Sequence, residues 1–162
     1  GDSTAIPYEL MTNNDTLRRL RYALNLNNAQ VASLIARTGK ETSTAEVDQW
    51  LKREDEEGAV DISDTTLCRF LDGLIIEKRG PRPDGTLPEA LEFLSNNEVL
   101  KKLRIALELR DDDMSSVFEQ AEFVVTKAEL GSFFRKEGHR QYRSCPEQVL
   151  RKFLLGLSKK SE

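Results

Sequence analysis

The chain contains an internal duplication. Residues 12–74 align with residues 95–157 at a constant offset of 83 positions without a gap, and 17 of the 63 aligned positions are identical. Many other positions exchange similar residues, such as Trp50 with Phe133. Such a repeat is typical of a structural unit that completes its core against a neighbouring copy, and a unit of about 65 residues is small for an independent core. We therefore expect two similar units that pack against each other with pseudo-twofold symmetry, or against copies in another chain.

Both copies show helical periodicity throughout, and no alternating strand pattern competes with it. Capping signals mark helix starts, because a hydroxyl and an acidic side chain three residues later can bind the N–H groups of a first turn. TNND at 12–15 and STAE at 43–46 have this spacing, and so do SNNE at 95–98 and TKAE at 126–129. We predict an all-α fold of two tandem four-helix units, with helices at 13–26, 29–37, 44–54 and 63–78, and at 96–109, 112–121, 127–137 and 145–158.

The segment between the copies has the composition of a linker. Three of the five prolines and two glycines lie in GPRPDGTLP at 80–88, and both residue types favour turns. The overlapping PEALEFL is compatible with a short helix. We divide the chain into a first helical repeat at 12–80, a linker at 81–94 that could contain this short helix, a second repeat at 95–158 and a tail at 159–162. Residues 1–11 are expected to be an expression remnant or a disordered extension.

The composition is that of a soluble globular protein. With 38% hydrophobic and 32% charged residues, the chain has no apolar run long enough for a transmembrane helix or a signal peptide, so we expect a cytoplasmic protein without membrane contact. Neither Cys68 nor Cys145 has a nearby cysteine, which favours buried thiols over a metal or redox site. The net charge of −4 argues against binding of nucleic acid through overall charge, and a local basic patch remains compatible with it.

One arginine keeps its identity between the copies while its basic neighbours do not. Two adjacent arginines become lysines in the second copy, whereas Arg21 is retained as Arg104. Both lie on the apolar stripe of their helix and should need a partner. On the third helix of each copy, Glu54 and Glu137 likewise continue the apolar stripe with i, i+3, i+4, i+7 spacing. Because a guanidinium binds a carboxylate bidentately and a lysine does not, we predict partly buried ion pairs Arg21–Glu54 and Arg104–Glu137. An anion or phosphate site at Arg21 is the functional alternative.

The C-terminal part of the chain is locally basic. Residues 134–162 contain eight Lys or Arg against three Glu, and arginines mixed with an aromatic ring can contact phosphates and bases. A solubilising surface is the alternative. The opening helices of the first copy are similar to repressor-type helix-turn-helix domains, with 44–54 in the position of the recognition helix, although TGKETS is longer than the usual turn. We predict that the second repeat contacts RNA or DNA through Lys127, Arg135, Lys136, His139, Arg140, Tyr142, Arg143, Arg151 and Lys152.

No motif in the chain points to catalysis. A phosphate-binding glycine loop, a metalloprotease helix, a nucleophile elbow and a paired-cysteine zinc site are all missing from the sequence. A surface His139 is favoured over a Cys/His dyad, because a distance of six residues from Cys145 does not place a base beside a nucleophile. The acidic run 54–57 lacks the ligand spacing of a hard-cation loop. We expect a binding protein without enzymatic activity, cofactor or metal. The alternative to nucleic-acid binding is a protein-interaction adaptor or homo-oligomer that uses apolar surface and this acidic turn.

Four segments of the chain resemble a known family. The segments NNDTLRRLRYAL, WLKREDEEG, FLDGLIIEKRG and NNEVLKKLRIAL, in this order, are similar to the YehS family of small bacterial cytoplasmic proteins, and the resemblance extends from Met11 to about residue 158. It implies a domain of unknown function that is present twice in each chain, in a bacterial cytosol. It provides no catalytic residues. It also implies that Met11 is the natural start.

Overall fold

The structure is a computed structural model of the chain and describes residues 10–160. Within these residues it contains eight α-helices and no strand, which confirms the predicted all-α fold of two four-helix units. The helices are α1 (Asn13–Ala23), α2 (Asn28–Ala36), α3 (Thr44–Leu51), α4 (Asp64–Arg79), α5 (Asn96–Ala106), α6 (Asp111–Gln120), α7 (Lys127–Phe134) and α8 (Glu147–Lys160).

Reciprocal capping begins several of these helices. At α1, the Thr12 hydroxyl accepts a hydrogen bond from the Asp15 backbone N–H, and the Asp15 carboxylate accepts one from the Thr12 N–H. The same device begins α3 and α7, as the sequence predicted. Asn27 and Gln30 form a further reciprocal pair at α2, which a search for hydroxyl caps overlooks. Local side-chain chemistry therefore fixes where most helices start.

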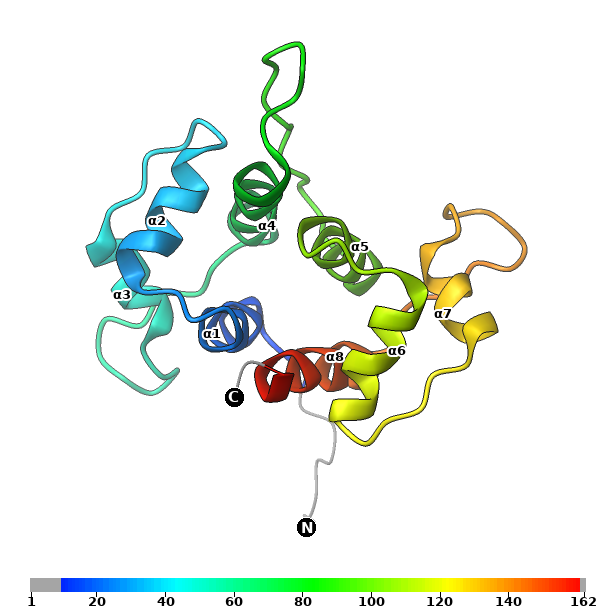
Figure 1. The fold of residues 1–162 in the computed structure, drawn as a ribbon. Coiled ribbons are helices and arrows are strands. Elements are labelled where there is room, and N and C mark those ends of the chain that lie inside the picture. The colour runs from blue at the N-terminus through cyan, green and yellow to red at the C-terminus, as the bar shows by residue number, and fades with distance from the viewer. Residues whose placement is uncertain (1–9, 161–162) are drawn as a thin grey trace.

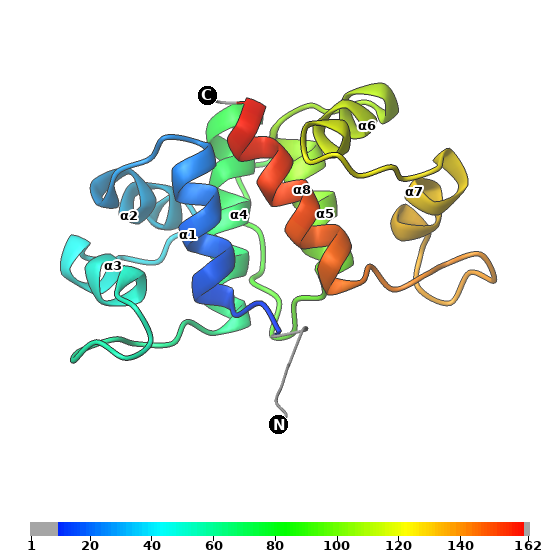
Figure 2. The ribbon, with the colours of Figure 1, turned by 90° about the horizontal axis from the view of Figure 1, so that it is seen from below.

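The two units pack through their first and fourth helices. α4 of the first unit packs along α5 of the second, and α8 of the second unit packs along α1 of the first. These four helices form the centre of the molecule, with α2 and α3 on one side and α6 and α7 on the other (Figures 1 and 2). Because α1 corresponds to α5 and α4 to α8 in the repeat, the two central interfaces are equivalent. The units are thus related by the expected pseudo-twofold symmetry.

A shared apolar core explains why two copies are needed. Leu20, Phe70, Leu103 and Phe153 are at most 1% exposed and belong to one hydrophobic cluster that includes residues of both units. α1 and α4 of the same unit share few contacts, because each has its main central partner in the other unit. A separated unit would expose the apolar face that its partner covers.

The second helix of each unit lies very close to the fourth helix. Gly73 in α4 and Gly156 in α8 occupy equivalent positions in the repeat. A Cβ atom placed on Gly73 would lie 1.9 Å from the carbonyl oxygen of Leu34, and one on Gly156 would lie 1.9 Å from that of Val117. No side chain fits at either position without a shift of backbone, so glycine permits the contact between α2 and α4 and that between α6 and α8.

The third helices are shorter than predicted. α3 ends at Leu51 and α7 at Phe134, each three residues before the predicted end. The next residues, Lys52 and Arg135, are extended, with ψ angles of 150° and 154°. The acidic and basic residues that follow therefore belong to loops and do not continue the helical faces.

The linker also differs from the prediction. No helix forms within 81–94. Its backbone is instead bound to α4, because the Leu94 N–H donates to Asp64 (2.8 Å) and the Leu91 N–H donates to the Cys68 thiol (3.4 Å). These contacts compete with the i to i+4 bonds that a helix would need. α8 continues through Lys160 into the predicted tail, and most of the predicted 1–11 extension lies outside the described residues.

Candidate nucleic-acid interface

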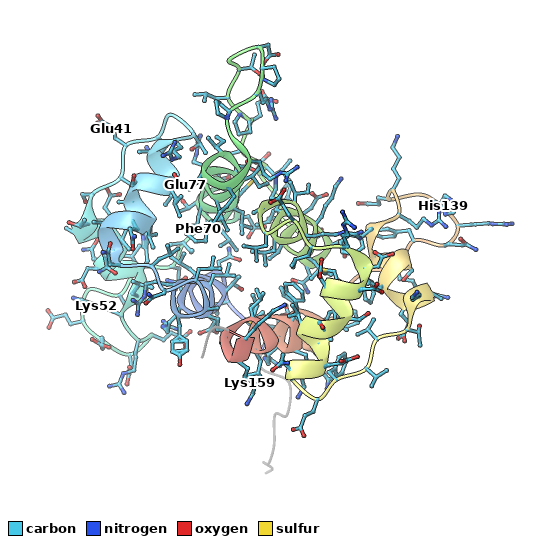
Figure 3. The ribbon with its side chains drawn as sticks, in the orientation of Figure 1. Glu41, Lys52, Phe70, Glu77, His139 and Lys159 are labelled. Carbon is cyan, nitrogen blue, oxygen red and sulfur yellow. The ribbon has the colours of Figure 1, made fainter. Side chains whose placement is uncertain are left out.

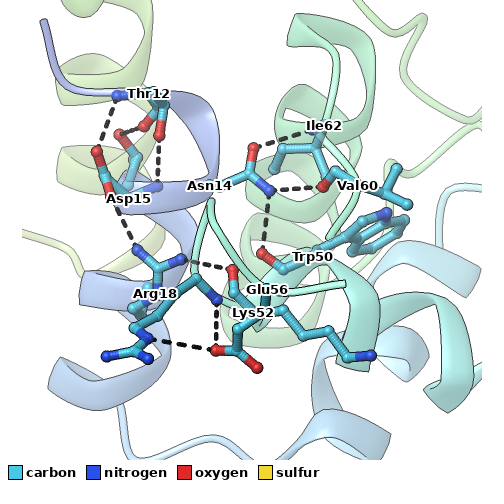
Figure 4. Close-up of polar contacts among 11 residues, drawn as sticks. Thr12, Asn14, Asp15, Arg18, Trp50, Lys52, Glu56, Val60 and Ile62 are labelled. Carbon is cyan, nitrogen blue, oxygen red and sulfur yellow. Dashed lines mark hydrogen bonds and ion pairs between the residues drawn. The ribbon is translucent and has the colours of Figure 1, made fainter. Parts of the chain in front are cut away.

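An asparagine near the start of the first helix holds the loop after the third helix in each unit. The Asn97 side-chain NH₂ donates to the carbonyl oxygens of Phe133 (3.0 Å) and Arg143 (2.8 Å), and its oxygen accepts from the Cys145 N–H (2.8 Å). Asn14 makes the same three bonds at the equivalent positions Trp50, Val60 and Ile62 (Figure 4). Asn14 and Asn97 occupy equivalent positions of the two copies, and the retained asparagine is the sequence signal that could have revealed this role.

Replacing Asn97 with Ala is expected to lower the free energy of unfolding by about 2 kcal/mol, because the buried N–H of Cys145 and two carbonyl groups lose their partner. Urea denaturation measures this change. Gln148→Ala removes an exposed amide from α8 and serves as the control, with an expected change within about 0.5 kcal/mol. Equal midpoints for Asn97→Ala and the parent protein would contradict the assigned role.

The loop held in this way encloses a cleft with the end of the third helix and the start of the first. The cleft of the first unit has a volume of about 360 Å³ and that of the second about 460 Å³. Equivalent side chains line both clefts: Asn14, Arg18, Lys52 and Arg53 in the first unit, and Asn97, Lys101, Arg135 and Lys136 in the second. The duplication has therefore produced two versions of one surface feature.

The basic side chains of the first cleft are bound within the protein. Arg18 forms an ion pair with Asp15 (2.8 Å) and donates to the Lys52 carbonyl (3.2 Å; Figure 4). Arg53 lies 3.5 Å from the Glu56 carboxylate of the acidic turn at 54–57. Three basic and four acidic side chains line this cleft, so it offers little attraction to a polyanion.

The basic side chains of the second cleft have no such partners. Lys101, Arg135 and Lys136 line it, and no ion pair joins any of them to a carboxylate within residues 10–160. Three basic and two acidic side chains line this cleft. The half-buried Tyr142 lines it where the first unit has Ala59. The second cleft thus combines available positive charge with an aromatic ring.

The structure brings only some of the predicted contact residues to this cleft. Arg135, Lys136 and Tyr142 line it. The loop from α7 to α8 also carries the exposed His139, Arg140 and Arg143, and Figure 3 shows His139 at the outer edge of the second unit. The remaining three predicted residues lie on neither the cleft nor this loop. They are the exposed Lys127 at the start of α7, and the half-buried Arg151 and Lys152 on α8. Lys101, which lines the cleft, was not among the predicted contacts.

The predicted pairing of Arg104 with Glu137 was wrong. The Arg104 guanidinium donates to the Leu109 carbonyl (3.2 Å) and to the Asp111 carboxylate (2.9 Å). It also lies over the Phe134 ring, 4.6 Å from the ring centroid. Glu137 is exposed in the loop after α7. Because α7 ends at Phe134, Glu137 is not on the helical face that the predicted spacing assumed.

The predicted pairing of Arg21 with Glu54 was wrong for the same reason. Glu54 lies beyond the end of α3 and is exposed. Arg21 donates to the Leu26 carbonyl (3.2 Å), which is equivalent to the bond from Arg104 to Leu109. The two retained arginines therefore bind the chain where it leaves the first helix of each unit, and both are half-buried there.

The Cys145 and His139 side chains do not form a catalytic pair in this geometry. Burial, with the Glu147 carboxylate as a further cause, raises the pKa of the Cys145 thiol to about 12. Its thiol donates to the Pro146 carbonyl (3.6 Å), whereas the ring nitrogen Nδ1 of the exposed His139 accepts from the Gln141 N–H (3.0 Å). A thiol with so high a pKa holds its proton near neutral pH and is a poor nucleophile.

Residues 10–160 offer neither a metal site nor a membrane span. They contain no group of three or more His, Cys, Asp or Glu side chains arranged to hold a metal ion. None of their helices is both long enough and apolar enough to cross a membrane.

The fold and its paired clefts define a class: an all-helical protein built from a tandem duplication in which the copies complete one core. The family described as protein of unknown function (DUF1456) matches residues 13–80 and 96–161, so the chain belongs to this family. The chain is 39% identical to the uncharacterized protein YehS of Escherichia coli (strain K12) over 148 aligned residues. The aligned region covers 91% of this chain and 95% of that protein. No solved structure matches the chain. The resemblance to the YehS family is thereby confirmed.

Proposed function

We propose that the protein binds a single-stranded segment of RNA or DNA at the cleft of the second unit. The observation that carries the proposal is the difference between two equivalent clefts. Lys52 and Arg53 in the first unit are held by groups of the acidic turn, whereas Arg135 and Lys136 have no carboxylate partner within the described residues.

The chemistry of the second cleft suits a flexible polyanion. Exposed guanidinium and ammonium groups can replace the counterions of a phosphate backbone, and the Tyr142 ring offers a surface on which a base can stack. Arg140 and Arg143 extend the positive charge along the same loop. The shape of this site, a cleft and a loop, favours a single strand over a duplex.

A protein-interaction role for the acidic turn has less support. Residues 54–57 are the feature that would attract a basic partner, but Arg53 pairs with this turn and the Glu56 carboxylate caps the Arg53 N–H (2.9 Å). Part of the negative charge of this turn is therefore neutralised by Arg53 of the same protein.

The direct test is the fluorescence anisotropy of a labelled single-stranded RNA of mixed sequence, measured across a salt series. Arg135→Gln/Lys136→Gln is expected to weaken binding at least tenfold at low salt. It should also reduce the slope of log affinity against log salt by about 1.4, because each phosphate contact to a single strand contributes about 0.7. A labelled DNA strand of the same sequence distinguishes the two nucleic acids.

The first unit provides a matched control at the equivalent positions. Lys52→Gln/Arg53→Gln removes the same number of charges from the other cleft, and its affinity should stay within about twofold of the parent protein. Equal weakening by both double variants would indicate a general charge effect and reject the second cleft as the site. Absence of binding to RNA and DNA at low salt would reject the proposal as a whole.

A further inference from the structure

We propose that the interface between α1 and α8 holds a second site, which binds a small phosphate monoester with an attached ring, such as a nucleoside monophosphate. A groove of about 370 Å³ lies there, lined by Arg18, Arg19, Arg21 and Tyr22 of α1 and by Leu155 and Ser158 of α8, among others. The C-terminal ends of these two helices lie on the same side of the molecule (Figure 2). This site does not depend on the cleft of the second unit.

The α4–α5 interface is equivalent to the α1–α8 interface by the pseudo-twofold symmetry. Two basic residues of α5 have carboxylate partners. At the interface of α4 and α5, Lys102 binds the buried carboxylate of Asp72 (2.6 Å). Arg104 binds Asp111 (2.9 Å) and lies over Phe134. Two basic side chains of α5, one directed to α4 and the other to α6, are therefore neutralised by carboxylates of the protein.

Neither of these two carboxylates is present at the equivalent position of the repeat. Leu155 occupies the position equivalent to Asp72, and Asn28 occupies the position equivalent to Asp111. The corresponding cations, Arg19 and Arg21, are retained. Within residues 10–160, neither forms an ion pair with a carboxylate. The groove thus holds two guanidinium groups whose equivalents elsewhere in the same protein are neutralised.

A hydrogen-bond donor without a partner belongs to one of the arginines that line the groove. The Nε atom of Arg21 is buried and has no hydrogen-bond partner within the described residues. Its counterpart in Arg104 donates to the Leu109 carbonyl (3.2 Å). Buried donors without partners are uncommon in folded proteins, and this one belongs to a side chain that lines the groove. Arg18, in contrast, is already paired with Asp15.

The rest of the groove sets the class of ligand. Guanidinium groups bind phosphate oxygens through pairs of parallel hydrogen bonds. Tyr22 is 58% exposed and presents a ring face on which a base can stack, while Leu155 provides an apolar surface beside it. The Ser158 hydroxyl donates to the Leu155 carbonyl (2.7 Å), so the arginines are the principal donors. A volume of about 370 Å³ lies within the range of small-ligand sites.

Calorimetric titration with adenosine 5′-monophosphate tests this site. The parent protein should bind the nucleotide at low salt, with weaker binding of inorganic phosphate and none of adenosine. Leu155→Asp restores the carboxylate found in the symmetric interface, so it should neutralise Arg19 and weaken nucleotide binding at least tenfold. Leu155→Asn is close in size but uncharged and should retain binding within about threefold.

Two further variants separate this site from the cleft of the second unit. Arg19→Gln should weaken nucleotide binding at least tenfold, whereas Arg135→Gln/Lys136→Gln should leave it unchanged. Absence of nucleotide binding by the parent protein would overturn the inference. So would equal losses for Leu155→Asp and Leu155→Asn, because charge would then not be the cause. Loss of nucleotide binding in the Arg135 and Lys136 double variant would also overturn it.

Discussion

Gly156→Ala is expected to lower the free energy of unfolding by about 3 kcal/mol or more, a large overpacking effect for one added methyl group. The new Cβ would lie 1.9 Å from the Val117 carbonyl oxygen and 3.0 Å from a Val117 side-chain carbon. Because the nearest obstacle is backbone, a change of rotamer cannot relieve the overlap, and α6 must move away from α8. Gly73→Ala should have a similar effect through Leu34 in the first unit.

Gly131→Ala is the matched control for this prediction. Gly131 is also a helical glycine, in α7, but no atom lies within 4 Å of a Cβ placed there. The same substitution should therefore stabilise the protein by about 0.5 to 1 kcal/mol through helix propensity alone. Chemical denaturation of the three variants measures these differences. A loss below about 1 kcal/mol for Gly156→Ala would show that α6 and α8 are not packed this closely.

The sequence predicted the architecture well, because the relevant signals are local and occur twice. Helical periodicity and reciprocal caps, such as Thr12 with Asp15, identified all eight helices, and the constant offset between the copies indicated two equivalent units. The glycines and asparagines that hold these units were not recognised, although they are identical between the copies. Their role depends on a close approach between distant segments, which spacing along one helix does not reveal.

The error at Arg21 and Arg104 has a specific physical origin. The spacing of apolar residues on the third helices continues to suggest a helix up to Glu54 and Glu137, so both glutamates were placed on the wrong structural element. The chain becomes extended at Lys52 and Arg135, two residues after the carbonyl group that the asparagine of each unit binds. Both retained arginines do make contacts within their own unit, but with backbone carbonyl groups and not with the glutamates that were predicted.

The two copies share a framework and differ in how charge is distributed over it. The positions that fix the backbone, such as Asn14 with Asn97 and Gly73 with Gly156, are the same in both units. The positions of carboxylates, in contrast, differ between the copies: the first cleft has an acidic turn that the second lacks, and the α4–α5 interface has Asp72 where the α1–α8 interface has Leu155. Cations without a carboxylate partner within residues 10–160 consequently line both proposed sites, Arg135 and Lys136 at the second cleft and Arg19 and Arg21 at the α1–α8 interface.

Lys102→Met is expected to lower the free energy of unfolding by about 3 to 5 kcal/mol, the range for removing one partner of a buried ion pair. The Asp72 side chain is 5% exposed and lies between the two units, 2.6 Å from the Lys102 ammonium. Its other side-chain contact is the Cys68 thiol at 3.4 Å, a weak donor. Without the lysine, a carboxylate would remain buried at the α4–α5 interface with no cation to balance it.

Asp72→Leu, which copies the residue at the equivalent position 155, should cost less than Lys102→Met. The lysine side chain is 17% exposed, and its flexible stem can carry the ammonium group to water once the carboxylate is gone. The double variant Asp72→Leu/Lys102→Met removes both charges and should be more stable than Lys102→Met alone, with a coupling energy of about 2 kcal/mol in the double-mutant cycle. Urea denaturation of the four proteins provides that cycle. Additive effects would mean that the two side chains do not interact, and equal losses for the two single variants would mean that the lysine cannot reach solvent from this interface.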